Sequence, residues 1–109
     1  MPQPAAASFA ELGLDPRLVR VLAAGDIREP FAIQARALPD ALAGRDVLGR
    51  GRTGSGKTIA FSIPLVTALA EGHTMACRPR GLVLVPTREL ASQVQAVLAP
   101  LARAMGLTV

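Results

Sequence analysis

A single lysine stands near the middle of the chain, in a stretch rich in glycine and hydroxyl residues. The stretch is GRGRTGSGKT, residues 49–58, and the other eleven basic residues of the chain are all arginine. Its order Gly-x-x-x-x-Gly-Lys-Thr over residues 51–58 matches the loop that holds the phosphates of a nucleoside triphosphate. The alternative is a glycine-rich turn that matches by chance. A true phosphate loop is expected between a strand and a helix, and the neighbouring patterns place it there.

Each residue type in this loop supplies something that phosphate binding needs. Glycines let backbone N–H groups turn toward phosphate oxygens, and the N-terminus of the following helix adds partial positive charge. Lys57 reaches the β- and γ-phosphates as a mobile point charge, whereas an arginine fork is bulkier and planar. Thr58 offers a hydroxyl to Mg²⁺, which makes it the candidate metal ligand, and Lys57 and Thr58 are the candidate catalytic residues. The predicted nucleotide-binding residues of the loop are Gly51, Arg52, Thr53, Gly54, Ser55, Gly56, Lys57 and Thr58.

Alternating strand and helix patterns surround the loop. Residues 46–50 read as a short strand, and residues 57–71 carry a nearly continuous apolar helical pattern. GLVLV, residues 81–85, is typical of a strand buried on both faces. A helix over residues 88–105, capped by Thr87 and broken or bent at Pro100, is followed by a third strand at 107–109. This order predicts an α/β fold with a parallel sheet and helical crossovers.

Two further helices are predicted before the loop. Asp15 and Pro16 form a strong helix start, and the run ends at Gly25. A second helical stretch covers residues 32–43, is interrupted at Pro39 and stops at Gly44. Residues 1–8 are rich in proline and alanine and are predicted to be disordered.

Composition limits the classes of function. A chain of 109 residues is enough for one small domain, and its formal charge of +4 permits contact with phosphate without requiring it. The single cysteine excludes an internal disulfide, and the lack of a Cys/His cluster argues against zinc. No signal peptide or membrane span is evident, which predicts a soluble cytoplasmic protein with no membrane partner. With only three aromatic residues, any nucleic acid is expected to be held mainly by its backbone.

A second stretch, DIREPFAIQ at residues 26–34, precedes the loop. Together they resemble the DEAD-box RNA helicase family from Phe9 onward, with the closest likeness to bacterial members. The stretch is similar to the family's adenine-reading Q motif, which implies that Gln34 pairs with adenine N6 and N7, as amides can, and that Phe9 covers the base. The alternatives are an exposed helix glutamine and a core phenylalanine. Phe31 stands where the family often has serine or threonine, whose hydroxyl would touch the phosphate loop, so Phe31 is left out of the predicted site.

A third stretch, PTREL at residues 86–90, resembles the family's motif Ia, which contacts the RNA backbone. This implies that Pro86, Thr87 and Arg88 bind RNA. Arg88 is predicted in the first turn of a helix, where positive charge is unfavourable. A phosphate bound there would turn that cost into an advantage. The alternative is that Glu89 simply offsets Arg88.

The resemblance also implies a RecA-like phosphate-loop domain and shows what this sequence does not contain. After Asp46 the only acidic residues are Glu71 and Glu89, so the family's Asp-Glu pair for Mg²⁺ and water is absent. We therefore expect residues 9–109 to be the truncated N-terminal half of such a domain, binding ATP and RNA but inactive without a missing C-terminal RecA-like domain. The alternatives are a stand-alone nucleotide- or RNA-binding module without turnover, and another phosphate-loop ATPase.

Overall fold

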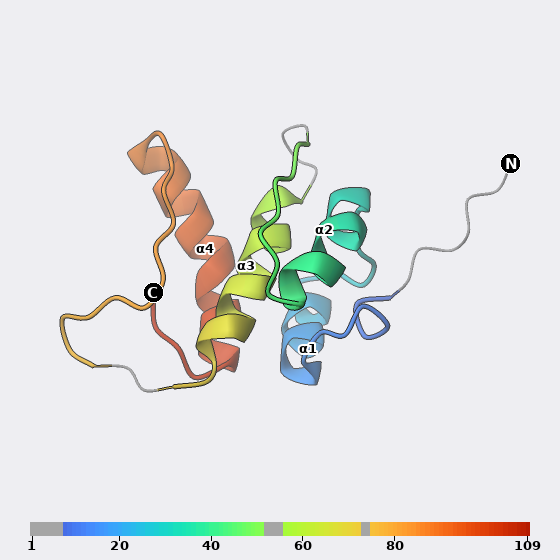
Figure 1. Cartoon of the computed structure of the whole chain (residues 1–109), viewed down its shortest axis with the longest axis horizontal. Helices are drawn as coiled ribbons and strands as arrows, with labels where there is room; N and C mark the ends of the chain where they lie inside the picture. The colour runs from blue at the N-terminus through green and yellow to red at the C-terminus, as the bar shows by residue number, and fades with distance from the viewer. Residues whose placement is uncertain (1–7, 52–55, 73–74) are drawn as a thin grey trace, which may run out of the picture.

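The computed structural model describes residues 8–51, 56–72 and 75–109, and these contain four helices (Figure 1). Their bounds are α1 Pro16–Ala24, α2 Ala32–Leu42, α3 Lys57–Leu69 and α4 Arg88–Ala104. All four helices predicted from the sequence are confirmed, with ends within two residues of the expected ones. The predicted disorder of residues 1–8 falls almost entirely outside the described residues, which begin at Ser8.

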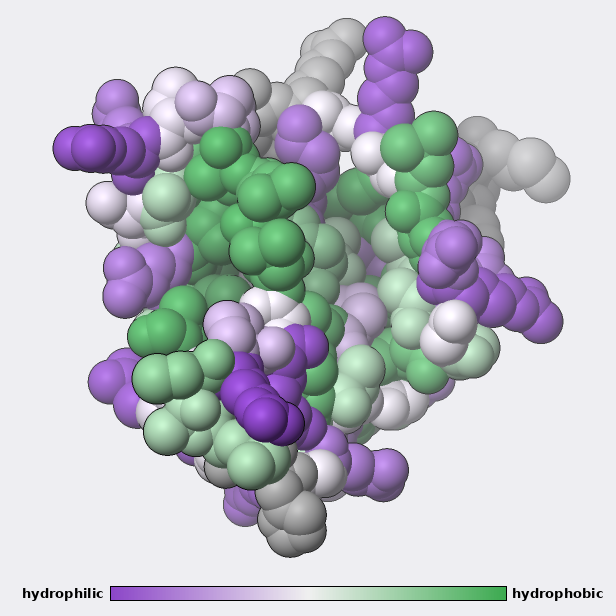
Figure 2. Space-filling model, turned by 60° about the vertical axis from the view of Figure 1, so that its left-hand side comes forward, coloured by the Kyte–Doolittle hydropathy of each residue, from purple (hydrophilic) through white to green (hydrophobic). Residues whose placement is uncertain are grey.

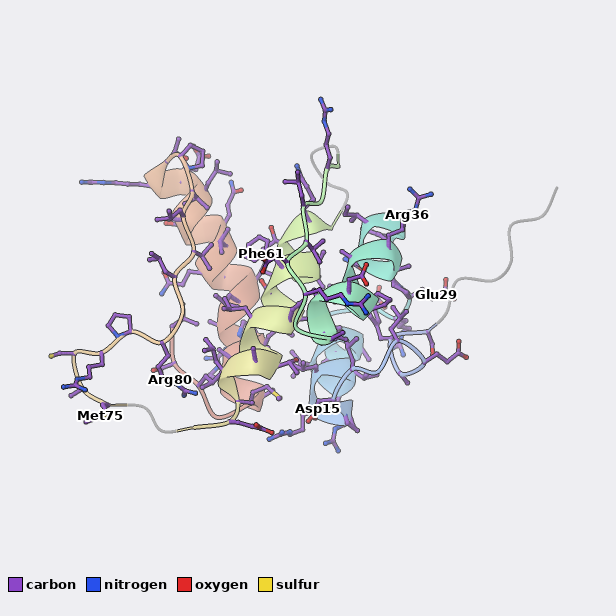
Figure 3. The ribbon with its side chains drawn as sticks, in the orientation of Figure 1. Asp15, Glu29, Arg36, Phe61, Met75 and Arg80 are labelled. Carbon is purple, nitrogen blue, oxygen red and sulfur yellow. The ribbon has the colours of Figure 1, made fainter. Side chains whose placement is uncertain are left out.

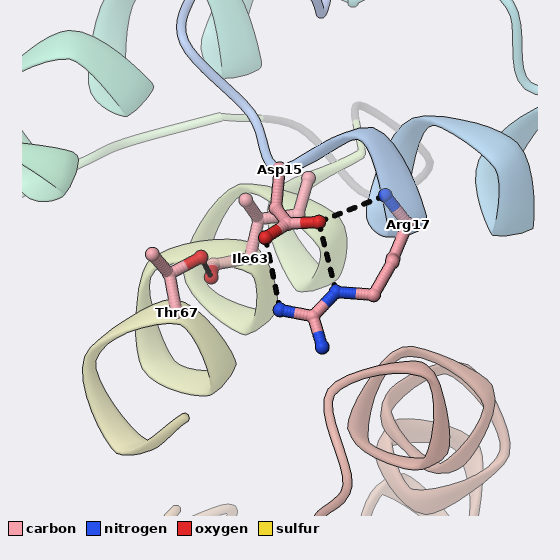
Figure 4. Close-up of polar contacts among 4 residues, drawn as sticks. All are labelled: Asp15, Arg17, Ile63 and Thr67. Atoms are coloured by element: carbon pink, nitrogen blue, oxygen red, sulfur yellow. Dashed lines mark hydrogen bonds and ion pairs between the residues drawn. The ribbon is translucent and has the colours of Figure 1, made fainter. Parts of the chain in front are cut away.

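The start of α1 follows from its capping residues. Asp15 Oδ1 accepts a hydrogen bond from the Arg17 N–H at 2.9 Å, and Pro16 needs no partner because it has no N–H (Figure 4). The Arg17 guanidinium folds back and donates to both carboxylate oxygens at 3.0 Å. These hydrogen bonds lower the pKa of Asp15 to about 2. The chain thus places a negative charge of its own at the positive end of α1.

Three helices contain a proline in their interior: Pro39 in α2, Pro64 in α3 and Pro100 in α4. α2 continues through Pro39 to Leu42 and α4 through Pro100 to Ala104, so the expected interruption at Pro39 and the break at Pro100 do not occur. An interior proline removes one helical hydrogen bond and costs about 3 kcal/mol. Burial on both sides of Pro100 offsets this cost, because Leu98 and Leu101 pack into the core.

The core lies where the four helices meet. α3 lies between α2 and α4 and contacts both, while α1 packs directly against α4 (Figure 1). Apolar side chains from all four helices and from the segment before α1 form one cluster. Its buried members are Phe9, Leu14, Leu18, Leu22, Leu38, Ile63, Val66, Leu98, Leu101, Ala102 and Met105.

The predicted strands at 46–50, 81–85 and 107–109 are not formed, so the expected parallel sheet is not shown. Across the described ranges, the only β pairing is an isolated antiparallel bridge between Met75 and Arg78. Figure 1 shows the segments before α3 and α4 running in the same direction but apart from each other. A strand needs a neighbour for its N–H and C=O groups, and neither segment lies close enough to serve the other.

Without a sheet, apolar side chains of residues 81–85 remain exposed. Leu82 and Leu84 are 78% and 83% exposed, whereas Val83 and Val85 line a groove of about 620 Å³ between α3 and α4. Figure 2 shows apolar side chains gathered on this hollowed face. The alternation expected of a strand is therefore present without the sheet. No helix among the described residues is long and apolar enough to cross a membrane.

Candidate functional site

The phosphate loop joins α3 at Gly56, where the backbone conformation favours glycine. Gly56 caps α3 with φ +85°, a left-handed conformation that residues with side chains rarely adopt. Its carbonyl accepts the first hydrogen bond of the helix, from the Ala60 N–H at 3.1 Å. Lys57 is exposed and Thr58 is half-buried in the first turn. Predicted site residues Arg52, Thr53, Gly54 and Ser55 lie outside the described residues, and Gly51, which precedes them, is half-buried.

Gln34 connects α2 to this end of the loop. Its Oε1 accepts from the Phe31 N–H at 2.9 Å, and its Nε2 donates to the Gly56 carbonyl at 3.1 Å. The side chain is 1% exposed. The alternative of an exposed helix glutamine is therefore wrong for this structure. One N–H and one lone pair of the amide remain, and contact with adenine stays a prediction.

Phe9 occupies a different environment from the one expected of a residue that covers a base. It is 2% exposed and belongs to the core cluster with Leu14 and Leu18. This position matches the alternative of a core phenylalanine. A base could reach the ring only if these neighbours moved.

Phe31 is the residue at this site that the sequence interpretation left out. The residue is 56% exposed, and its Cδ2 lies 2.7 Å from the point where a Cβ on Gly56 would stand. The sequence did offer one signal for Phe31, which is its position: this residue immediately precedes α2 and lies three residues before Gln34. The apolar ring, which cannot replace a serine or threonine hydroxyl, concealed that signal.

The predicted RNA-contacting residues start α4. Thr87 Oγ1 accepts from the Leu90 N–H at 3.1 Å, so the predicted cap is confirmed. Pro86 and Arg88 are exposed. Figure 1 shows the N-terminal ends of α3 and α4 at the same end of the molecule. Two helix termini with partial positive charge therefore face one side, beside the exposed cations Lys57 and Arg88.

Acidic residues are scarce around these termini. Glu89 follows Arg88 in the first turn of α4. Within the described ranges, no group of three or more His, Cys, Asp or Glu residues could hold a metal ion. Among the described residues of the phosphate loop, Thr58 is the one with a hydroxyl that could contribute to Mg²⁺ binding.

The family is decided by a match that covers most of the chain. A sequence model of the family described as "DEAD/DEAH box helicase" matches residues 31–109, which include Gln34, the phosphate loop and the PTREL stretch. The chain belongs to this family. The match begins at Phe31, the residue beside the phosphate loop.

Curated relatives agree with this assignment. Human "Probable ATP-dependent RNA helicase DDX28" is 45% identical over 108 residues, covering 94% of this chain and 20% of the relative. "DEAD-box ATP-dependent RNA helicase 16" of Arabidopsis thaliana is 46% identical over 90 residues, covering 80% of this chain and 14% of the relative. The chain thus spans a fifth or less of their length. These relatives are eukaryotic, so the expected likeness to bacterial members is not supported.

Solved structures point to the same domain. The RNA helicase Prp28 of Chaetomium thermophilum bound to ADP has a TM-score of 0.88 and 38% identity, covering 100% of this chain and 27% of that one. Dbp5 of S. cerevisiae bound to RNA and ADP BeF₃ has a TM-score of 0.69 and 34% identity, covering 89% of this chain and 25% of that one. The arrangement of the four helices is therefore that of the corresponding part of DEAD-box helicases.

Proposed function

We propose that this chain is the ATP-binding and RNA-contacting part of an ATP-dependent RNA helicase. The observation that carries the proposal is the joint between α2 and α3, where Gln34 is hydrogen-bonded to Gly56 directly before Lys57 and Thr58. The loop sequence alone supports only binding of a nucleoside triphosphate. The hydrogen bond that joins the Q motif to this loop adds support for a DEAD-box type of ATP site. The relatives named as ATP-dependent RNA helicases and the structure with bound ADP support the same conclusion.

In this proposal the nucleotide phosphates lie at the N-terminus of α3. The Lys57 ammonium binds the β- and γ-phosphates, and the Thr58 hydroxyl is a ligand of Mg²⁺. The N–H groups of the first turn and the helix dipole stabilise the negative charge. Mg²⁺, when bound, neutralises charge on the phosphates and orients them. Adenine recognition is assigned to the amide of Gln34.

RNA is proposed to bind at the start of α4 through its backbone. The Arg88 guanidinium and the N–H groups near Thr87 reach phosphate oxygens, which carry no sequence information. Because α3 and α4 start at the same end of the molecule (Figure 1), ATP and RNA would bind near each other. We place this function in the cytoplasm and propose no membrane partner.

Hydrolysis and unwinding are proposed for a protein of the relatives' length, including a second RecA-like domain. A second candidate, a binding module without turnover, is favoured for these 109 residues alone by one observation. After Asp46 the sequence offers only Glu71 and Glu89, and neither belongs to a carboxylate pair at the phosphate end.

The two candidates can be separated by measuring ATP binding and RNA-stimulated phosphate release for this chain and for the product of the full reading frame. We expect both proteins to bind ATP and only the longer one to hydrolyse it. Turnover by the 109 residues would contradict the assignment of hydrolysis to the longer protein. Failure of the chain to bind ATP would contradict the proposed function itself.

A further inference from the structure

The segment at the start of α2, from the capping residue Phe31 to Ile33, lies against described residues before and after the phosphate loop. On the far side of the loop, the Cδ2 of Phe31 stands 2.7 Å from a Cβ position on Gly56. On the near side, the Cδ1 of Ile33 stands 3.4 Å from the Cβ position on Gly49. Only a hydrogen atom occupies each of these glycine positions, so the side chains of α2 can approach the backbone closely. Gly49 and Gly56, two described residues on either side of residues 52–55, are therefore each approached by a side chain from the start of α2.

A hydrogen-bonded path joins the same elements. The Phe31 N–H donates to Gln34 Oε1, and Gln34 Nε2 donates to the Gly56 carbonyl, which also accepts from the Ala60 N–H of α3. Gly56 thus has two neighbours from this segment: Gln34, which donates to its carbonyl and lies nearest its Cβ position, and the Phe31 ring. This fixes the residue whose left-handed conformation directs the chain into α3.

The exposure of Phe31 indicates that its ring has a role outside the core. At 56% exposed, it is no member of the buried cluster that holds the four helices together. Burial therefore gives little reason for a phenylalanine here, and contact with Gly56 gives a specific one. A ring has no hydroxyl to donate, so it can act only by excluding other positions of the loop.

We infer that Phe31 is a positioning residue that keeps the end of the phosphate loop in its phosphate-binding conformation. The inference rests on the proposed binding of ATP and adds to it a residue whose contact is with the loop rather than with adenine. Its consequence is specific: loss of the ring weakens every ligand that carries a triphosphate by the same factor, whatever its base.

The first test measures calorimetric affinities for MgATP, MgGTP and inorganic triphosphate with Mg²⁺. We expect Phe31→Ala to weaken all three about tenfold, the factor that follows if the competent loop falls from most of the population to a tenth. Phe31→Leu, which retains a Cδ2 atom, should stay within about twofold of the unmodified chain on the same reasoning. Unchanged affinities in Phe31→Ala would overturn the inference, and a loss confined to MgATP would assign the ring to the base instead.

A second test does not depend on the folding of Phe31→Ala. The chain has no tryptophan or tyrosine, so Phe31→Trp introduces one fluorescent reporter at the loop. Met75→Trp is the matched control, because Met75 is also 56% exposed but lies far from the start of α3 (Figure 3). Inorganic triphosphate should change the fluorescence of Phe31→Trp saturably and leave that of Met75→Trp constant.

The outcomes separate the inference from the proposed function. If Phe31→Trp binds triphosphate by calorimetry but its fluorescence does not change, the positioning role is overturned and the proposal of ATP binding still stands. Absence of nucleotide binding by the unmodified chain would overturn both.

Discussion

The starts of α1 and α3 show two ways of treating the positive end of a helix. At α1 the chain supplies its own anion, since the Asp15 carboxylate accepts from the Arg17 N–H (Figure 4). At α3 the capping residue is Gly56, which brings no side chain. The two starts lie at opposite ends of the molecule in Figure 3, where Asp15 is labelled. The difference agrees with the proposed binding of the ATP phosphates at the start of α3.

The start of α4 lies between these cases. Thr87 supplies a neutral hydroxyl that occupies the Leu90 N–H, and exposed Arg88 follows. A hydroxyl satisfies a donor without neutralising the helix dipole. The three starts therefore form a series from an internal anion to none. This series agrees with the proposed ligands, which are RNA phosphates at α4 and the triphosphate of ATP at α3. No external ligand is proposed at α1.

The largest expected effect of a substitution is at the start of α3, on the affinity for ATP. Lys57→Ala should lower ATP affinity about ten- to a hundredfold, because a charge-assisted contact is worth about 1.5–3 kcal/mol. The unfolding temperature should stay the same, since Lys57 is exposed. Even Lys57→Arg should bind poorly, and Arg45→Ala, at another exposed cation, is the control. An arginine variant with normal affinity would contradict the role given to the only lysine.

Removal of the Gln34 side chain, which joins α2 to Gly56, is expected to affect both stability and ATP affinity. Gln34→Ala leaves the Phe31 N–H and the Gly56 carbonyl without this partner, which costs about 1–3 kcal/mol when such groups are buried. Both the unfolding temperature and the ATP affinity should fall, while RNA binding without nucleotide is unaffected. Competition binding of ATP and GTP sharpens the assignment. Equal affinities in the unmodified chain would rule out adenine reading by Gln34.

The start of α4 should respond more weakly and through salt. Arg88→Ala is expected to weaken RNA binding uniformly across sequences and to reduce the salt slope by about one phosphate contact. Arg103→Ala removes an exposed arginine at the other end of the same helix and should leave RNA binding unchanged. Filter binding at several salt concentrations provides the measurement. Equal effects of the two variants would remove the special role of the N-terminus.

The smallest effect is expected at α1, as a dependence of stability on pH. The pKa of Asp15 is lowered from 3.8 to about 2 by the hydrogen bonds from Arg17. A lowered pKa stabilises the fold above the unfolded value, and this contribution is lost as pH falls from 3.8 toward 2. Thermal unfolding of Asp15→Ala should show a lower midpoint at neutral pH and a smaller loss across that interval. ATP affinity at neutral pH should not change.

The helices could be predicted from the sequence because their signals are local. Asp15 with Pro16, Thr87 and the glycines after the helices set the ends within a turn. The strands could not, because a strand is completed by neighbours elsewhere in the chain. GLVLV has the composition of a buried strand, yet Leu82 and Leu84 are exposed.

The site was predictable to the same extent. The loop residues follow from their spacing, whereas the hydrogen bond from Gln34 to Gly56 joins residues 22 positions apart. No local pattern announces such a contact. Phe31 was missed for a related reason, since its contact with Gly56 depends on how α2 packs against α3. Phe9 shows the converse: the resemblance implied that it covers the base, but it packs in the core with Leu14 and Leu18.

The central claim is that an external triphosphate binds at the start of α3 and not at the start of α1. The most direct test is to follow the backbone amide resonances of a ¹⁵N-labelled chain by NMR while MgATP is added. The account predicts saturable shifts at Gly56, Lys57 and Thr58, with Arg17 and Leu18 in the first turn of α1 unchanged. Equal shifts at the two helix starts, or none at residues 56–58, would contradict it.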